Sequence, residues 1–192
     1  MRYLIACMLM VPSVALAEPV VDDEAIIHHA KHNCPGIKPS KVKESILRDL
    51  MAVENRFSPP ASLKGMTLAA ACFESKYNPT AKGDYRKVKN RRVPMAIGIL
   101  QQWPWVERFY KINRRNHKEA TSAWMQHIVR QLHYVKKKCK WRSPHRRWIA
   151  AWVTAIRYPK KGGRCHERPK HLKVLKRWHR AIKLTYDEDF GC

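Results

Sequence analysis

The sequence predicts an all-α fold built as one compact domain. Apolar residues recur at helical spacing in several segments, whereas alternating Val-rich runs and hairpin turn pairs, which indicate strands, are missing. A chain of 192 residues is long enough for one domain with a substantial core and hardly long enough for two. We therefore expect helices throughout, with at most a short β-ribbon within a long surface loop from Thr80 to Pro94.

The N-terminus has the pattern of a secretory signal peptide. A basic Arg2 precedes an apolar stretch from Leu4 to Val14, and small residues at 15 and 17 form a cleavage site. We expect cleavage after Ala17 and a periplasmic or secreted protein; a retained membrane anchor is the alternative. No apolar run later in the sequence is long enough to cross a bilayer.

Residues 18–57 are expected to form an N-terminal helical extension. Its main helix stops at Ser58-Pro59-Pro60, since prolines interrupt helices. The apolar residues that predict this helix are Val42, Ile46, Leu47, Leu50, Met51 and Phe57. His28, His29 and His32 are expected on a solvated helix, because no carboxylate or fourth ligand of suitable spacing completes a metal site.

A second helix is predicted from Ala61, and it ends just after a single carboxylate. It must stop before Asn78-Pro79, because a residue that precedes proline avoids the α conformation. Glu74 therefore lies in its last turns, directly after the apolar run at residues 68–73. A carboxylate beside an apolar wall is costly unless it is paired or used in chemistry. Glu74 is thus a candidate general acid, or else a surface carboxylate paired with Lys76 or a neighbouring arginine.

Four further helices are predicted in the C-terminal half. The last of them belongs to residues 159–192, a basic tail that we expect to pack on the domain. Ser143-Pro144 supplies an N-cap and a first-turn proline for the third of them. The segments and their inward residues are Trp105 to Tyr110; Trp124, Ile128, Leu132 and Val135; Trp148, Ile149, Trp152 and Ile156; and Leu172, Leu175, Trp178 and Ile182.

The formal charge of +24 predicts binding to polyanions: nucleic acid, anionic lipid headgroups or the anionic polymers of a bacterial wall. Export argues against chromosomal DNA, so the cell envelope is the leading candidate and no specific nucleic-acid partner is expected. The basic runs at 136–138 and 146–147 alternate with Trp141 and Trp148, a pattern more typical of helices with tryptophans inward and cations in solvent.

After signal cleavage five cysteines remain, an odd number. In an oxidising compartment four of them are expected to form two disulfides. Cys72 is expected as the free thiol, because it lies inside the apolar run. Among the three pairings open to Cys34, Cys139, Cys165 and Cys192, we favour Cys139 with Cys165 and Cys34 with Cys192, since the first closes a short loop.

Two motif blocks resemble the lytic transglycosylase family, the soluble-transglycosylase domain of the lysozyme-like superfamily. Its Glu-Ser-x-[Phe/Tyr]-[Asn/Asp]-Pro-x-Ala block matches residues 74–81, and its Ala-x-Gly-[Leu/Ile]-[Met/Leu]-Gln block matches residues 96–101. The resemblance implies a lysozyme-like domain over residues 58–158. The stretch between the blocks is longer and more basic than usual, which implies a reshaped cleft wall.

The resemblance implies that Glu74 is the catalytic acid and base. Breaking a glycosidic bond requires a proton donor with a pKa near the working pH, and an apolar wall raises the pKa of a carboxyl. Glycosidases usually use two carboxylates. Asp84 is a possible second one, which would activate water, or it is only a turn residue beside Gly83. Without it, the N-acetyl group of the substrate would supply the second function.

Other residues of the motifs are candidate substrate contacts. Gln101 either binds in the cleft or caps the apolar run, Ser75 and Asn78 either orient Glu74 or form a turn, and Tyr77 is either core or a sugar platform. The family's later Ala-Tyr-Asn-x-Gly block has no clean match at residues 151–155, which leaves Tyr158 or Tyr134 as substitutes. Trp103 and Trp105 flank a proline, where they stack on sugars or pack.

These observations predict a monomeric muramidase that cleaves the MurNAc–GlcNAc linkage of peptidoglycan strands without a cofactor or metal. Its products would carry 1,6-anhydro-MurNAc ends, and its basic surface would hold it on anionic envelope polymers. A hydrolase of the same bond is one alternative. A non-catalytic cationic protein that binds the wall or the membrane, with the segment from Arg168 to Lys183 on lipid, is another. A nucleic-acid binder has only the charge in its favour.

Overall fold

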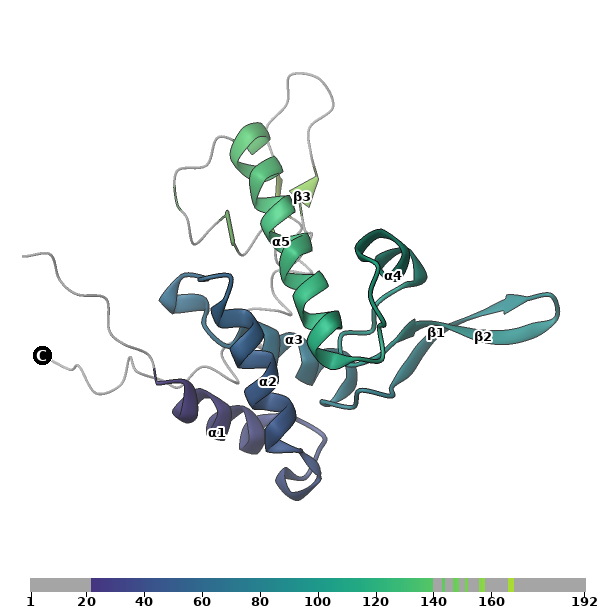
Figure 1. Ribbon diagram of the computed structural model, residues 1–192, viewed down its shortest axis with the longest axis horizontal. Helices are drawn as coiled ribbons and strands as arrows, with labels where there is room; N and C mark the ends of the chain where they lie inside the picture. The colour runs from purple at the N-terminus through teal and green to yellow at the C-terminus, as the bar shows by residue number, and fades with distance from the viewer. Residues whose placement is uncertain are drawn as a thin grey trace, which may run out of the picture.

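Helices dominate the structure, a computed structural model that describes residues 22–139, 143, 147–148, 151, 156–157 and 166–167. They gather in one body, from which a two-stranded antiparallel ribbon projects (Figure 1). The helices are α1 (Asp23–Asn33), α2 (Glu44–Asn55), α3 (Met66–Ser75), α4 (Pro104–Tyr110) and α5 (His117–Cys139), with 3-10 turns at Pro39–Lys41 and Ala61–Leu63. The strands are β1 (Lys82–Val88) and β2 (Arg91–Ile97), and a second short pair is β3 (Ile156–Arg157) with β4 (His166–Glu167).

Helix α2 lies at the centre of the core, in contact with α1, α3 and α5. Its apolar side chains interdigitate with those of the other helices in one cluster, which includes Ile27, Leu47, Leu68, Ile99 and Ile128. The N-terminal segment thus shares its core with the rest of the domain. In the part of the chain that the structure describes, no helix is both long and apolar enough to span a membrane; the expected signal peptide lies outside it.

The N-terminus of α3 is capped by a buried carboxylate from α2. Glu54 is fully buried, and its two oxygens accept hydrogen bonds from the backbone N–H of Gly65 (2.6 Å) and of Thr67 (2.7 Å). The Thr67 hydroxyl donates a further bond of 2.5 Å to the same carboxylate. Because the first N–H groups of a helix lack partners within it, these bonds satisfy donors that would otherwise be buried unpaired. Glu54 therefore fixes where α3 begins, a role that the sequence patterns do not reveal.

The C-terminus of α3 is a left-handed turn formed without glycine. Lys76 and Tyr77 both have positive φ, 57° and 62°. The Lys76 N–H bonds to the carbonyls of Ala71 and Cys72, and the Tyr77 N–H donates to the Ala71 carbonyl at 3.3 Å, so the last carbonyls of the helix have partners. The helix thus ends at Ser75, and the prediction that Glu74 lies in its last turn is confirmed.

A disulfide joins α1 to α3 and corrects the predicted cysteine pattern. Cys34 follows the last turn of α1 and bonds to Cys72 in α3, with Cα atoms 5.8 Å apart. Cys72 is therefore not the free thiol, and Cys34 does not pair with Cys192. The error came from taking burial as a sign of a free thiol, although both sulfurs of a bridge can lie in a core. Cys139 is also disulfide-bonded, while Cys165 and Cys192 lie outside the described residues.

The segment from Thr80 to Pro94 is not a long loop but most of a ribbon of two seven-residue strands. A two-residue turn connects the strands, and its residues Lys89 and Asn90 have positive φ, as the tight hairpin turns require. The sequence shows no apolar alternation here because both faces of the outer ribbon are exposed. Burial of one face is what produces alternation, so the pattern could not reveal these strands.

The helix predicted through Trp148, Ile149, Trp152 and Ile156 does not include Ile156, while Ile149 and Trp152 lie outside the described residues. Ile156 lies in β3, where it pairs with Glu167 of β4, rather than in a helix. The preceding helices agree better with the sequence: α2, α4 and α5 cover the segments that helical spacing predicted. Helical spacing therefore gave the wrong secondary structure for Ile156.

Glu54→Ala should lower the free energy of unfolding by about 2–4 kcal/mol, since it leaves buried N–H groups of α3 unpaired. The matched control is Arg56→Ala, two residues away and exposed, which should change it by less than about 0.5 kcal/mol. Denaturant titration monitored by circular dichroism measures both. Equal, small effects in the two variants would show that Glu54 does not hold α3.

Candidate active site

The structure brings the two motif blocks together at the end of α3. The Ser75 hydroxyl donates to the Ile99 carbonyl at 2.7 Å, and lies 3.1 Å from the Ala71 carbonyl in its own helix. On the far side of the turn, the Gly98 N–H donates to the Ala81 carbonyl at 2.9 Å. The blocks at residues 74–81 and 96–101 are therefore bonded to each other at two points, although the β1–β2 ribbon separates them in the sequence.

Glu74 combines access to solvent with an unfavourable environment for charge. Burial raises the pKa of its carboxyl from 4.5 to about 7, and the negative charge of Asp84 adds a smaller increase. Glu74 nevertheless keeps substantial exposed surface. The exposed surface and the raised pKa are compatible. Solvent can reach one side of a carboxyl that has protein on its other sides, and the pKa rises because solvation is lost on those sides.

None of the described residues donates a hydrogen bond to the Glu74 carboxyl or forms an ion pair with it. The alternative for Glu74, an ion pair with Lys76, is not among the ion pairs of the described residues. These pairs are Lys31–Glu44, Arg48–Glu24, Arg48–Glu44, Lys64–Asp23, Arg114–Glu107, His117–Asp49 and Lys118–Asp49. A carboxyl that can be reached by a ligand and holds a proton near pH 7 is suited to donate that proton.

Asp84 lies in β1, on the ribbon side of Glu74. Its carboxylate accepts a hydrogen bond of 3.1 Å from the indole N–H of Trp103, and the Arg86 guanidinium lies 4.6 Å from the centre of the same indole. Asp84 is exposed and has a positive φ of 47°. It is therefore held in place and close enough to influence Glu74, while it remains open to solvent.

The other two acidic side chains of this region have structural partners. Glu107 pairs with Arg114 at 3.0 Å, and Glu119 accepts bonds from the Asn113 backbone and the Asn116 side chain. Arg114 is buried, and its guanidinium also donates to the carbonyls of Met95 (2.9 Å) and Gln102 (2.7 Å). Arg114 thus ties the base of the ribbon to α4. Sequence reasoning missed it among the many surface cations.

Two glycines permit the close packing behind the site. Gly98 has φ of +82°, and a Cβ atom there would lie 2.1 Å from the Arg114 carbonyl oxygen. A Cβ atom on Gly83 would lie 2.4 Å from the side-chain oxygen of Gln101. Gln101 itself has φ of 45° and donates from its amide to the Gly98 carbonyl at 3.0 Å. This local bond matches the capping role considered for Gln101, and its half-buried side chain packs against β1.

Two other predicted contacts, Tyr77 and Asn78, have partners within the fold. Tyr77 is buried, and its hydroxyl lies 3.3 Å from the Ala30 carbonyl, so it belongs to the core rather than to a sugar-binding surface. Asn78 accepts bonds from the Thr80 N–H (2.9 Å) and hydroxyl (2.8 Å), which shape the turn after α3. Tyr158 lies outside the described residues.

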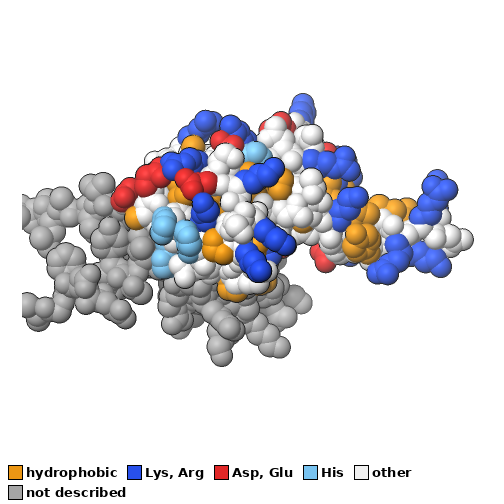
Figure 2. Space-filling model, turned by 90° about the horizontal axis from the view of Figure 1, so that it is seen from below, with side chains coloured by type: hydrophobic (Ala, Val, Ile, Leu, Met, Phe, Trp, Pro, Cys, Tyr) orange, Lys and Arg blue, Asp and Glu red, His pale blue; other side chains and the backbone are white. Residues whose placement is uncertain are grey.

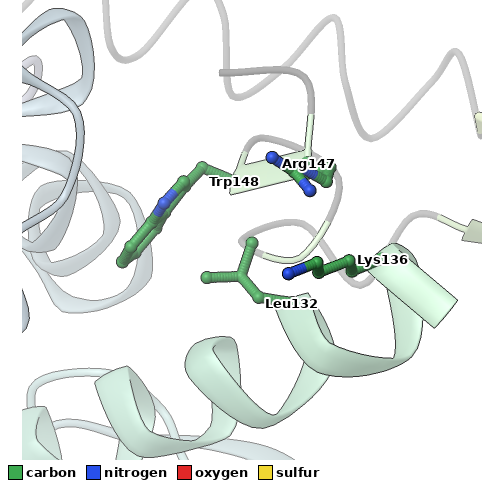
Figure 3. Close-up of a pocket in the computed structure, with 4 residues that line it drawn as sticks. All are labelled: Leu132, Lys136, Arg147 and Trp148. Atoms are coloured by element: carbon green, nitrogen blue, oxygen red, sulfur yellow. The ribbon is translucent and has the colours of Figure 1, made fainter. Parts of the chain in front are cut away.

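A separate pocket of about 210 Å³ lies by the C-terminal half of α5, lined by Leu132, Lys136, Arg147 and Trp148 (Figure 3). In the figure Leu132 and Lys136 rise from α5, and Arg147 and Trp148 lie on the segment that faces it. None of these residues belongs to the motif blocks. Among the described residues, no group of three His, Cys, Asp or Glu side chains is placed to bind a metal ion.

Comparison with known proteins does not identify the chain: no protein-family model, no curated protein and no solved structure matches it.

Gly98→Ala should lower the free energy of unfolding by about 2–4 kcal/mol, because the added Cβ displaces the Arg114 backbone and strains a left-handed residue. Gly36→Ala is the matched control. Gly36 has nearly the same φ, +80°, but its Cβ would meet only the Lys76 side chain at 3.8 Å. Gly36→Ala should lower the free energy of unfolding by about 1 kcal/mol. Equal losses in thermal or denaturant unfolding would mean that the contact with Arg114 is unimportant.

Proposed function

We propose that the protein is a peptidoglycan lytic transglycosylase with a lysozyme-like fold, and that Glu74 is its catalytic acid and base. The observation that carries the proposal is the Glu74 carboxyl: it is accessible, unpaired among the described residues, and has a pKa raised to about 7. The bonded motif blocks and the mainly helical body with a ribbon beside the acid support the same assignment. Export to the periplasm or outside the cell is part of the proposal.

In the proposed reaction Glu74 first donates its proton to the glycosidic oxygen between MurNAc and GlcNAc. The carbonyl oxygen of the substrate's N-acetyl group stabilises the sugar cation as the bond breaks. The Glu74 carboxylate then removes the proton from the sugar's own 6-hydroxyl, whose oxygen attacks the anomeric carbon. The product is a 1,6-anhydro ring, no water is consumed, and Glu74 regains its proton. One carboxyl near pKa 7 can perform both transfers.

Hydrolysis of the same bond is the second candidate, and Asp84 is the observation that favours it. Its charge already acts on Glu74, and the Trp103 indole N–H holds its carboxylate in place. In this alternative Asp84 would activate a water molecule, as in glycosidases with two carboxylates. Mass spectrometry of the muropeptides separates the two reactions, because a reducing end is one water heavier than an anhydro end.

Glu74→Gln should lower the rate of wall lysis at least about 100-fold, since glutamine cannot donate the proton. The variant should remain folded. Because the folded-state pKa of about 7 exceeds the ordinary 4.5, the carboxyl favours folding most below pH 4.5, and this contribution is lost as the pH rises through 7. Relative to wild type, the variant should therefore gain stability between pH 5 and pH 8. Loss of turbidity of purified peptidoglycan and denaturant unfolding are the measurements.

The control for this variant is Glu24→Gln, which removes an exposed carboxylate in a surface pair with Arg48 and should leave lysis unchanged. Wall-lysing activity that survives in folded Glu74→Gln would contradict the proposed function. Binding to wall fragments without any lysis by the wild type would favour the non-catalytic alternative.

Asp84→Asn should shift the pH dependence of lysis. In the wild type, kcat/KM should fall as the pH rises through about 7, where Glu74 loses its proton. Removing the negative charge of Asp84 lowers the pKa of Glu74, so the fall should begin at a lower pH. A profile that does not move would show that Asp84 has no electrostatic effect on the acid. Loss of all activity at every pH, with reducing ends in the wild-type products, would instead assign Asp84 to hydrolysis.

A further inference from the structure

The β1–β2 ribbon carries a concentration of positive charge that the proposed catalysis does not use. Between Lys82 and Arg92 the only acidic residue is Asp84, at the base of the ribbon. All the cations are exposed, and they are Lys82, Arg86, Lys87, Lys89, Arg91 and Arg92. Figure 2 shows Lys and Arg side chains gathered over the projecting ribbon, at the right of the view, together with hydrophobic ones.

Exposed apolar side chains accompany these cations. Tyr85, Val88 and Val93 are 48%, 47% and 39% exposed. The Arg92 guanidinium lies 5.5 Å from the centre of the Tyr85 ring, but it leaves half of that side chain in solvent. Two large aliphatic residues and an aromatic one on a narrow projection are a costly arrangement in water, and exposed apolar groups of this kind mark interaction sites.

Both faces of the outer ribbon have this mixed character. The register places Tyr85 opposite Pro94 and Lys87 opposite Arg92 on one face. On the other face Arg86 lies opposite Val93, and Val88 lies opposite Arg91. A partner with a flat surface would contact only one face. A partner that surrounds the end of the ribbon, by contrast, would contact the cations and the apolar groups on both faces.

We propose that the outer ribbon, residues 85–93, inserts into the headgroup layer of an anionic lipid bilayer. Each Lys or Arg near such a surface is attracted by its negative potential, and Tyr is favoured at the boundary between headgroups and acyl chains. The two valines would enter the upper acyl region, while the long cationic side chains reach back to phosphate. An anionic polysaccharide would use the cations but leave Tyr85, Val88 and Val93 in water.

The depth of insertion is limited by the backbone. A two-stranded ribbon has unpaired N–H and C=O groups along both edges, and these cannot enter the hydrocarbon without a large cost. Lys89 and Asn90 at the turn are also polar. The ribbon therefore rests at the interface and does not span the membrane. This inference goes beyond the proposed glycan chemistry and does not depend on it.

The first test removes charge from the ribbon. Binding of the full chain to vesicles of phosphatidylglycerol and phosphatidylethanolamine is measured by co-sedimentation, with phosphatidylcholine vesicles as the uncharged reference. The triple variant Lys87→Gln, Lys89→Gln, Arg91→Gln should bind on the order of a hundredfold more weakly to the anionic vesicles. None of these residues contacts the motif blocks in the described hydrogen bonds, so folding and glycan cleavage should be unchanged.

The matched control is Lys38→Gln, Lys41→Gln, Lys43→Gln, which removes equally exposed charges between α1 and α2. Both triple variants have the same net charge, so attraction from the chain as a whole falls equally in both. The control should bind within about threefold of wild type. An equal loss in the two triple variants would overturn the proposal in favour of a diffuse effect of charge.

The second test keeps the charge and removes apolar character. Val88→Thr, Val93→Thr retains two β-branched residues that suit strands, and should weaken binding to the anionic vesicles roughly tenfold. Unchanged binding would overturn insertion and leave a purely electrostatic contact, as expected for an anionic polymer. Because no glycan is present in these measurements, failure of the proposed catalytic function would not alter either result.

Discussion

The catalytic function proposed for this protein depends on how firmly α3 is held while its last turn presents a carboxyl to solvent. The helix is buried from Met66 to Cys72, so its polar ends must find partners inside the protein. Glu54 bonds its first N–H groups, the disulfide from Cys34 holds its middle, and Ser75 bonds its last turn to Ile99. Three interactions of different kinds therefore fix the position of α3, whose last turn carries Glu74.

The same burial explains the chemistry. Burial of its carboxyl penalises the charged form of Glu74, and the Asp84 carboxylate adds to this penalty. In a chain with a formal charge of +24, a cation beside Glu74 would have cancelled the effect. The described cations of the site have other partners: Arg114 bonds to Glu107 and to carbonyl groups, and Arg86 lies against Trp103. Among the described residues, no cation contributes to the pKa of Glu74, while the projecting ribbon carries several exposed cations.

Local patterns in the sequence were sufficient for the ends of α2 and α3 and for the position of Glu74 in the last turn of α3. The end of α2 before two prolines, the end of α3 before Asn78-Pro79, and the position of Glu74 after an apolar run all follow from neighbouring residues. The ribbon could not be predicted in this way, because neither of its outer faces is buried. The hydrogen bonds of Glu54 and Arg114 and the disulfide at Cys72 could not be predicted either. Each of them joins segments that only the fold brings together. Tyr77 shows the converse: its motif position suggested a ligand contact, but its hydroxyl meets the backbone of α1.

The most direct measurement is a pH titration of the Glu74 carboxyl by carbon-detected NMR, with Glu74→Gln used to assign the resonance. We predict a midpoint of about 7. A lower midpoint in the Asp84→Asn variant would show how much the charge of Asp84 contributes to the pKa of Glu74. A midpoint near the ordinary value of 4.5 would mean that water solvates the carboxylate freely, and Glu74 could then not be the proton donor at neutral pH.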